Sequence, residues 1–121
     1  MSIGAEAPRD RAKRLLFGRG KYVDDINLPR MLHLAFVRSP YAHARVAAID
    51  TARATALPGV VAVFTAADLD RAVSSWRAEH KLFPDMAAPE QSALAHDVVR
   101  WQGEAVTAVI AESRALAEDG A

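Results

Sequence analysis

Four histidines are the side chains of this sequence best suited to acid–base or metal chemistry, because the chain has no cysteine. They are His33, His43, His80 and His96. The spacings between them, 10, 37 and 16 residues, match no short ligand motif such as two histidines one helical turn apart. The lack of cysteine also excludes disulfides, iron–sulfur ligation and cysteine nucleophiles. We therefore expect no metal site in this chain.

A proline corner provides a second pair of candidates. Arg38 and His43 flank Pro40, a geometry that could present an anion site or a general base. The structural interpretation is that both side chains satisfy backbone carbonyls and a carboxylate at a chain corner. We favour this structural interpretation.

Two acidic residues, a glycine pair and the serines complete the set of chemical candidates. Asp24 and Asp25 suggest a hard metal site, but neighbours in an extended segment point to opposite sides, so a turn cap plus a surface pair is expected. Gly18 and Gly20 resemble part of a phosphate loop, but no predicted strand precedes them and no helix follows, so we expect a turn. No serine sits in a strand-to-helix elbow. We predict no catalytic, cofactor-binding or metal-binding residue in this chain.

The two tryptophans have different settings. Trp101 lies in a strand-like run and is expected in the core. Trp76 lies in an ambiguous segment and is either a core residue or an anchor for a partner.

Apolar runs of strand length predict strands at 31–37, 44–49, 60–64, 98–101 and 105–111. In the first of these, Leu32, Leu34 and Phe36 share one face, and the other face is also apolar, so burial on both faces is expected. Pro40 ends this strand, since proline cannot continue a strand ladder.

Capping signals predict short helices between the strands. One runs to Leu57 after a cap at Asp50 or Thr51, a second begins at the capping box of Thr65 and Asp68, and a third follows Ser113. Residues 70–95 are harder to interpret. The spacing of Val73, Trp76, His80 and Phe83 suits one face of a helix, and Pro84 and Pro89 then enforce an irregular segment.

Together these elements predict an α+β fold with one mixed sheet of about four to five strands and short helices. A length of 121 residues allows one domain, at 18–121, preceded by a polar N-terminal arm at 1–17. Fifteen basic and fifteen acidic residues cancel, which argues against nucleic acid or an anionic membrane as a partner. No run reaches the length of a signal peptide core or a membrane span, so we expect a soluble, cytoplasmic protein.

Several segments, in order, resemble the start of the large, molybdopterin-bearing subunit of the molybdenum hydroxylases, the family of aldehyde oxidase, xanthine dehydrogenase and aerobic carbon monoxide dehydrogenase. They are GRGKYVDDINLP at 18–29, MLH at 31–33, RSPYAHAR at 38–45, PGV at 58–60, TAADL at 65–69, VRWQGE at 99–104 and AED at 117–119. The resemblance implies an α/β hammerhead domain. Four residues depart from the family pattern: Arg30 replaces a usual glycine, Tyr41 a histidine, Gln102 a small apolar residue and Ala105 a proline.

What the resemblance implies is a scaffold and assembly module, truncated or split from its cofactor-binding domains. The full assembly would hydroxylate a substrate with oxygen from water and pass electrons from a molybdopterin cofactor to iron–sulfur and flavin partners. The expected partners are the remaining molybdopterin-binding domains or subunit, the iron–sulfur and flavin subunits, and a second copy of the chain. One alternative is a stand-alone, non-catalytic binding or regulatory protein with the same fold. A self-contained enzyme is disfavoured, because no nucleophile, base or metal set is evident.

Overall fold

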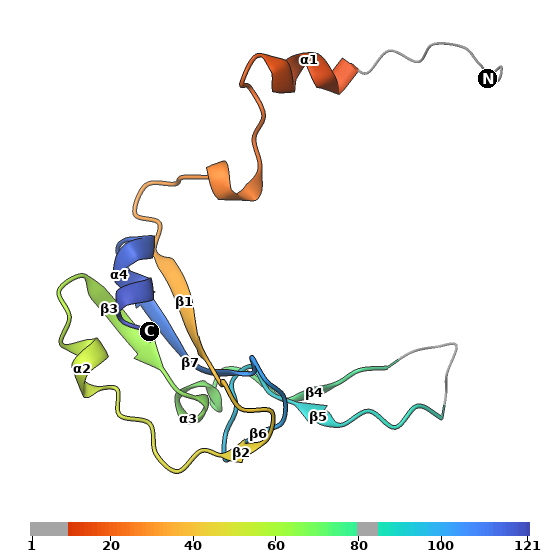
Figure 1. Ribbon diagram of the computed structural model, residues 1–121, viewed down its shortest axis with the longest axis vertical. Coiled ribbons are helices and arrows are strands. Elements are labelled where there is room, and N and C mark those ends of the chain that lie inside the picture. Colours follow the sequence, from red (N-terminus) through yellow and green to blue (C-terminus); the bar gives the residue numbers. More distant parts are fainter. Residues whose placement is uncertain (1–9, 80–84) are drawn as a thin grey trace. The chain divides into compact units, whose positions relative to one another are not determined.

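The computed structural model describes residues 10–79 and 85–121, and it divides into two compact units, Met1–Met31 and Leu32–Ala121 (Figure 1). The described part of the first unit holds helix α1 (Asp10–Leu16) and one 3-10 turn, η1 (Val23–Asp25). Helix α1 lies in the segment for which we expected a polar arm and no regular element. The expected boundary after residue 17 stays a prediction.

Glycine ends helix α1. Gly18 has φ +64°, its N–H donates to the carbonyl of Leu15, and the next N–H, of Arg19, donates to that of Arg14. This pair of bonds is the Schellman pattern, which needs a left-handed residue after the helix. The turn expected at Gly18 and Gly20 is therefore confirmed at Gly18.

A second left-handed position falls on a residue other than glycine. Arg30 has φ +62° and follows Pro29 in a turn closed by a hydrogen bond from Met31 N–H to the Leu28 carbonyl, 3.1 Å long. Proline second and positive φ third is the type II turn pattern, in which glycine is usual at the third position. The turn thus keeps the shape suited to glycine although Arg30 occupies it.

The second unit is built on three antiparallel strands in the order β1 (His33–Arg38), β7 (Ala105–Ala111), β3 (Val60–Phe64). Two small sheets pair β2 (Ala44–Arg45) with β6 (Val98–Val99) and β4 (Trp76–Arg77) with β5 (Glu90–Gln91). The α+β class is confirmed, but three separate sheets replace the single sheet that we expected. The corner at Ser39 and Pro40 separates β2 from β1, so β2 pairs elsewhere.

The helices begin where they were predicted, but α2 ends at Thr55 instead of Leu57, and its first N–H, of Ala52, donates to Asp50. They are α2 (Ala52–Thr55), α3 (Ala66–Leu69) and α4 (Arg114–Asp119). Thr65 and Asp68 form the predicted capping box at α3, and the Ser113 hydroxyl accepts a hydrogen bond from Leu116 N–H at α4. The described residues include no helix of the length and apolarity that a membrane crossing requires.

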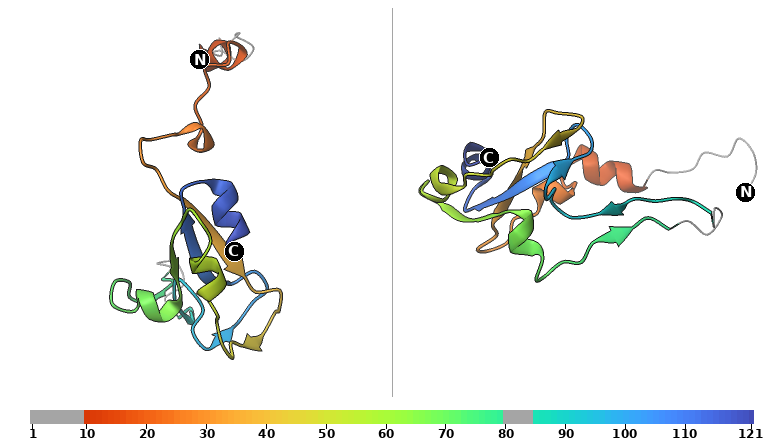
Figure 2. Two further views of the ribbon diagram at one scale, coloured as in Figure 1. Left: turned by 90° about the vertical axis from the view of Figure 1, so that its left-hand side faces the viewer. Right: turned by 90° about the horizontal axis from the view of Figure 1, so that it is seen from below.

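Helix α4 covers one face of the three-stranded sheet. It packs against β1 and β7 (Figures 1 and 2), with Ala117 and Val109 each only 1% exposed. On the opposite face, a smaller cluster of Ala66, Leu94 and Ala108 packs with Phe64, Leu69 and Ala105. The core therefore has one fully covered side and one side covered only near α3.

Burial of β1 on both faces was predicted, and this is wrong. Leu34 is 54% exposed and Phe36 is 40% exposed, whereas the residues between them are half-buried. Side chains alternate across a strand, so the face that carries Leu34 points away from α4. The sequence shows that both faces are apolar, but it cannot show that only one has a neighbouring element.

The helix expected within residues 70–95 is also wrong in its described part. Trp76 pairs with Gln91 and Arg77 with Glu90, so the segment forms two short strands that run side by side away from the main sheet (Figures 1 and 2). Three of the residues on which that expectation depended, His80, Phe83 and Pro84, lie outside the described residues. Spacing of three to four residues is weak support for a helix so close to two prolines.

Candidate functional site beside helix α3

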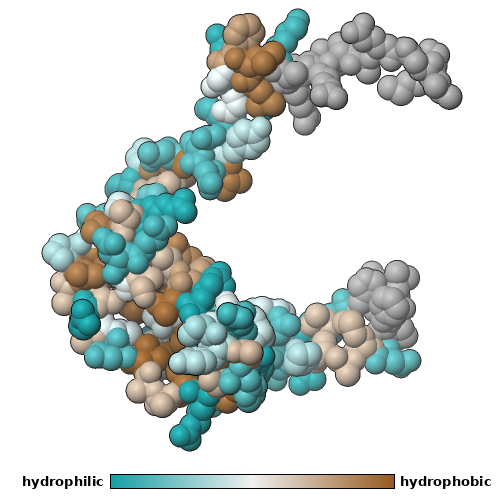
Figure 3. Space-filling view, viewed as in Figure 1, coloured by the Kyte–Doolittle hydropathy of each residue, from teal (hydrophilic) through white to brown (hydrophobic). Residues whose placement is uncertain are grey.

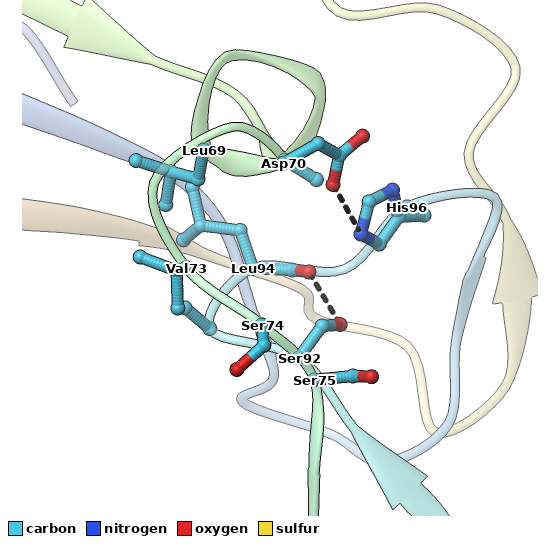
Figure 4. Close-up of a pocket in the computed structure, with 10 residues that line it drawn as sticks. Leu69, Asp70, Val73, Ser74, Ser75, Ser92, Leu94 and His96 are labelled. Carbon is cyan, nitrogen blue, oxygen red and sulfur yellow. Dashed lines mark hydrogen bonds and ion pairs between the residues drawn. The ribbon is translucent and has the colours of Figure 1, made fainter.

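A pocket of about 370 Å³ lies between α3 with its following loop and the segment 92–96 (Figure 4). Its size falls within the range of small-molecule sites. The floor is apolar and the rim is polar. The lining residues are Ala66, Leu69, Asp70, Val73, Ser74, Ser75, Ser92, Ala93, Leu94 and His96.

An acid–histidine pair stands at the rim of this pocket. The Nε2 atom of His96 lies 3.4 Å from Oδ1 of Asp70, and the two side chains are 44% and 57% exposed. Asp70 is fixed as the C-cap of α3, and His96 follows Ala95, whose N–H donates to the Ala105 carbonyl. A carboxylate that orients an imidazole is the arrangement of a general base.

The serines around this pair do not supply a nucleophile. The Ser92 hydroxyl donates to the Leu94 carbonyl at 2.8 Å, and the Ser75 hydroxyl donates to the Glu90 carboxylate. The Ser74 hydroxyl points away from His96 (Figure 4). Acyl transfer needs a hydroxyl within hydrogen-bond reach of the imidazole, and the pocket serines do not provide one.

The Glu90 side chain links β4 to β5 and is not available for chemistry in the pocket. The hydrogen bond from Ser75 and then the charge of Arg77 hold the pKa of its carboxyl below the ordinary value. The Arg77 Nη2 atom lies 3.6 Å from Glu90 Oε2. These contacts join the two strands and occupy the carboxylate.

The proline corner bears out the structural interpretation for Arg38. Its Nη1 donates to the Gly103 carbonyl at 2.9 Å, and its guanidinium lies 5.3 Å from the centre of the Phe36 ring. The neighbouring backbone is joined twice, by Ser39 N–H to the Glu104 carbonyl and by Gly103 N–H to the Ser39 carbonyl. His43 is exposed, and no described side chain or carbonyl is paired with it.

A buried carboxylate closes the turn opposite this corner. The Glu104 side chain is 6% exposed, its Oε2 accepts the Arg100 N–H, and its Oε1 lies 3.8 Å from Arg100 Nη1. Sequence inspection noted Glu104 only as part of a motif. Glu104 could have been found from the sequence, because an acid that lies between a turn glycine, Gly103, and a strand is well placed to accept hydrogen bonds from the turn.

The other sequence candidates are dispersed. Asp25 accepts the Tyr22 N–H at 3.0 Å, which is the turn cap that we expected. Among the described residues, no three histidine or acidic side chains gather where an ion could bind. His33 lies on β1 and His96 at the pocket, and His80 lies outside the described residues.

The prediction that Trp101 lies in the core is wrong, because it is 47% exposed, as is Trp76. Strand β6 ends at Val99, so Trp101 falls in the turn that leads to β7. Exposure leaves both tryptophans available to a partner.

Comparison with known proteins gives a consistent result. The family described as "Aldehyde oxidase and xanthine dehydrogenase, a/b hammerhead domain" matches residues 17–121. The large subunit of nicotine 6-hydroxylase from Paenarthrobacter nicotinovorans is 48% identical over 97% of this chain and 14% of its own length. The crystal structure of quinoline 2-oxidoreductase from Pseudomonas putida 86 superposes with a TM-score of 0.89 and 44% identity, over 98% of this chain and 15% of that one.

A second similar structure is that of a Cu,Mo-CO dehydrogenase. The Cu,Mo-CO dehydrogenase in its carbon monoxide reduced state has a TM-score of 0.82 and 42% identity, over 97% of this chain and 14% of that one. The chain thus spans about one-seventh of the length of these three proteins, at 14% to 15%. These matches show that the chain belongs to the aldehyde oxidase and xanthine dehydrogenase family, as its α/β hammerhead domain.

Proposed function

We propose that this chain is the scaffold and assembly module of a molybdenum-dependent hydroxylase large subunit. The observation that carries the proposal is the coverage, since nearly the whole chain matches only 14% of the nicotine 6-hydroxylase large subunit. Its partners would be the remaining domains of such a subunit, with iron–sulfur and flavin subunits in the assembly. A cytoplasmic site of assembly stays a prediction.

The described residues of this chain offer no set of side chains that would hold a molybdenum ion. The chain has no cysteine, and its described residues hold no cluster of three side chains suited to a metal. The polar groups of the α3 pocket are largely paired within the protein, since Ser75, Ser92 and His96 each have an internal partner. We therefore derive no catalytic step through this chain and assign the cofactor to other domains.

The alternative is a stand-alone binding protein that kept the hammerhead fold, and the α3 pocket is the observation in its favour. Its volume of about 370 Å³ would admit a small ligand. Against this, binding sites place unpaired polar groups at fixed positions, and this pocket offers few. A ligand that stabilises the isolated chain, with no large-subunit partner in the host, would favour this alternative.

Tagging the chain in its native host tests the module proposal. After purification we expect mass spectrometry to identify the remaining large-subunit domains, with molybdenum present in the complex by elemental analysis. The chain purified alone should contain no stoichiometric molybdenum. Stoichiometric molybdenum on the isolated chain, or a chain that remains monomeric and free of large-subunit domains, would reject the proposal.

A further inference from the structure

Three apolar side chains, in and just before β1, point to a face that no described helix or strand of the second unit covers. Leu32, Leu34 and Phe36 are 47%, 54% and 40% exposed. In the sheet, Leu34 pairs with Ile110 and Phe36 with Ala108, so these residues share the face. We call Leu32, Leu34 and Phe36, with Ile110 beside them, the β1 face. Figure 3 views this unit from the side of α4, so the β1 face lies on the far side.

The two sides of the same sheet differ sharply. Behind the β1 face, Val109 and Ala111 are 1% and 0% exposed under α4. In front, Ala66 and Leu94 cover Ala108, but this cover stops short of Leu34. Each square ångström of apolar surface left in water forgoes about 25 cal/mol. Only one face of this sheet is fully covered, so a partner that buries the apolar side chains of the other face would stabilise it.

One charged residue borders the β1 face. Arg38, at the end of β1, has its guanidinium bound to the Gly103 carbonyl and placed over the Phe36 ring. The remaining sheet neighbours, Ile110 and Ala62, are apolar. Because charged residues are depleted at the centre of stable interfaces, Leu32, Leu34 and Ile110 fit an apolar partner surface, with Arg38 at the edge of the contact.

We propose that the β1 face is the docking surface for the remaining polypeptide of the large subunit, contacted through apolar side chains. This proposal rests on the proposed function and names the surface through which it operates. The proteins that this chain matches are about seven times longer, because it spans 14% of their length, so the polypeptide to cover the face exists in them.

The size of the face favours this occupant over a second copy of the chain. Three side chains at about half exposure offer at most roughly 300 Å². A stable dimer needs about 800 Å² from each partner. Domains of one subunit can associate through patches that are individually smaller than a dimer interface. Several such patches act together, and the domains are held near one another.

The test compares two lysine variants that are matched in exposure. Leu34→Lys places a charge on the β1 face, and Val61→Lys places one at the β3 bulge, where Val61 is 55% exposed and Leu34 is 54%. Affinity for the separately expressed remainder of the large subunit is measured by calorimetry. We expect Leu34→Lys to weaken binding at least about tenfold and Val61→Lys to leave it within about twofold.

Leu34→Thr guards against misfolding, because threonine suits a strand and introduces no charge. It should melt near the wild-type temperature and weaken binding by less than Leu34→Lys does. If the wild-type chain does not bind the remainder at all, the proposed function fails. If it binds and Leu34→Lys binds equally well, only the β1-face inference fails. A third outcome is that the wild-type chain forms dimers, that Leu34→Lys is monomeric, and that both bind the remainder equally well. This result would assign the face to a second copy of the chain and overturn the inference.

Discussion

Gly59 and Gly103 have similar backbone angles and different surroundings. Their φ values are +83° and +89°, where other residues are strained. A Cβ at Gly59 would lie 2.5 Å from Leu116 Cδ1, whereas one at Gly103 would meet nothing within 4 Å. We expect Gly103→Ala to lower the free energy of unfolding by about 1 kcal/mol and Gly59→Ala to lower it by about 1 kcal/mol more.

Urea denaturation of the two variants measures both losses. Equal losses would show that Leu116 moves aside freely.

The burial of Glu104 predicts how much stability the protein loses when its charge is removed. Its side chain is 6% exposed and accepts a hydrogen bond from the Arg100 backbone. Glu104→Gln keeps the shape but removes the charge, so we expect a loss of about 1–3 kcal/mol in unfolding free energy. Glu118→Gln is the control. Glu118 pairs with Arg114 at 2.8 Å on an exposed helix, and such pairs contribute about 0.5 kcal/mol or less. Comparable losses in the two variants would contradict the role given to burial.

At the scale of elements, the start of α3 makes stability depend on pH. Hydrogen bonds from the Thr65 backbone N–H and then its hydroxyl, both 2.7 Å, hold the pKa of Asp68 below its ordinary 3.8. A lowered pKa in the folded state adds stability above the unfolded value, and this is lost as pH falls through the folded value. We expect wild type to be more stable than Asp68→Asn at pH 7, with the gap closing in acid.

The carboxyl titration of Asp68, followed by NMR, separates the two bonds. Thr65→Val removes the hydroxyl and keeps the backbone N–H, so the Asp68 pKa should rise only part of the way to 3.8. An unchanged pKa in Thr65→Val would mean that the hydroxyl bond contributes nothing.

Local chemistry explains which elements could be predicted from the sequence. The apolar, β-branched runs at 60–64 and 105–111 give β3 and β7 with their observed bounds. Ser113 caps α4 because a helix start is decided by adjacent residues. Pairing between distant segments is not local. The Asp70–His96 contact joins residues 26 apart in sequence, and it depends on α3 packing near the segment attached to Ala105. The exposure of Leu34 depends equally on where α4 lies.

At the scale of the whole chain, the division after Met31 predicts independent folding of the second unit. Every strand and the helices α2, α3 and α4 lie within Leu32–Ala121. Most described large apolar residues of the first unit are exposed, Leu16 to 85% and Val23 to 82%, so this unit has little core of its own. We expect a variant lacking residues 1–31 to melt within about 4 °C of the full chain, since the change in unfolding free energy should be below about 1 kcal/mol. Scanning calorimetry at matched concentrations measures this difference, and the retained amide protection of β7 serves as the control for a native sheet. A drop well beyond that range would mean that the first unit contributes to the stability of the sheet.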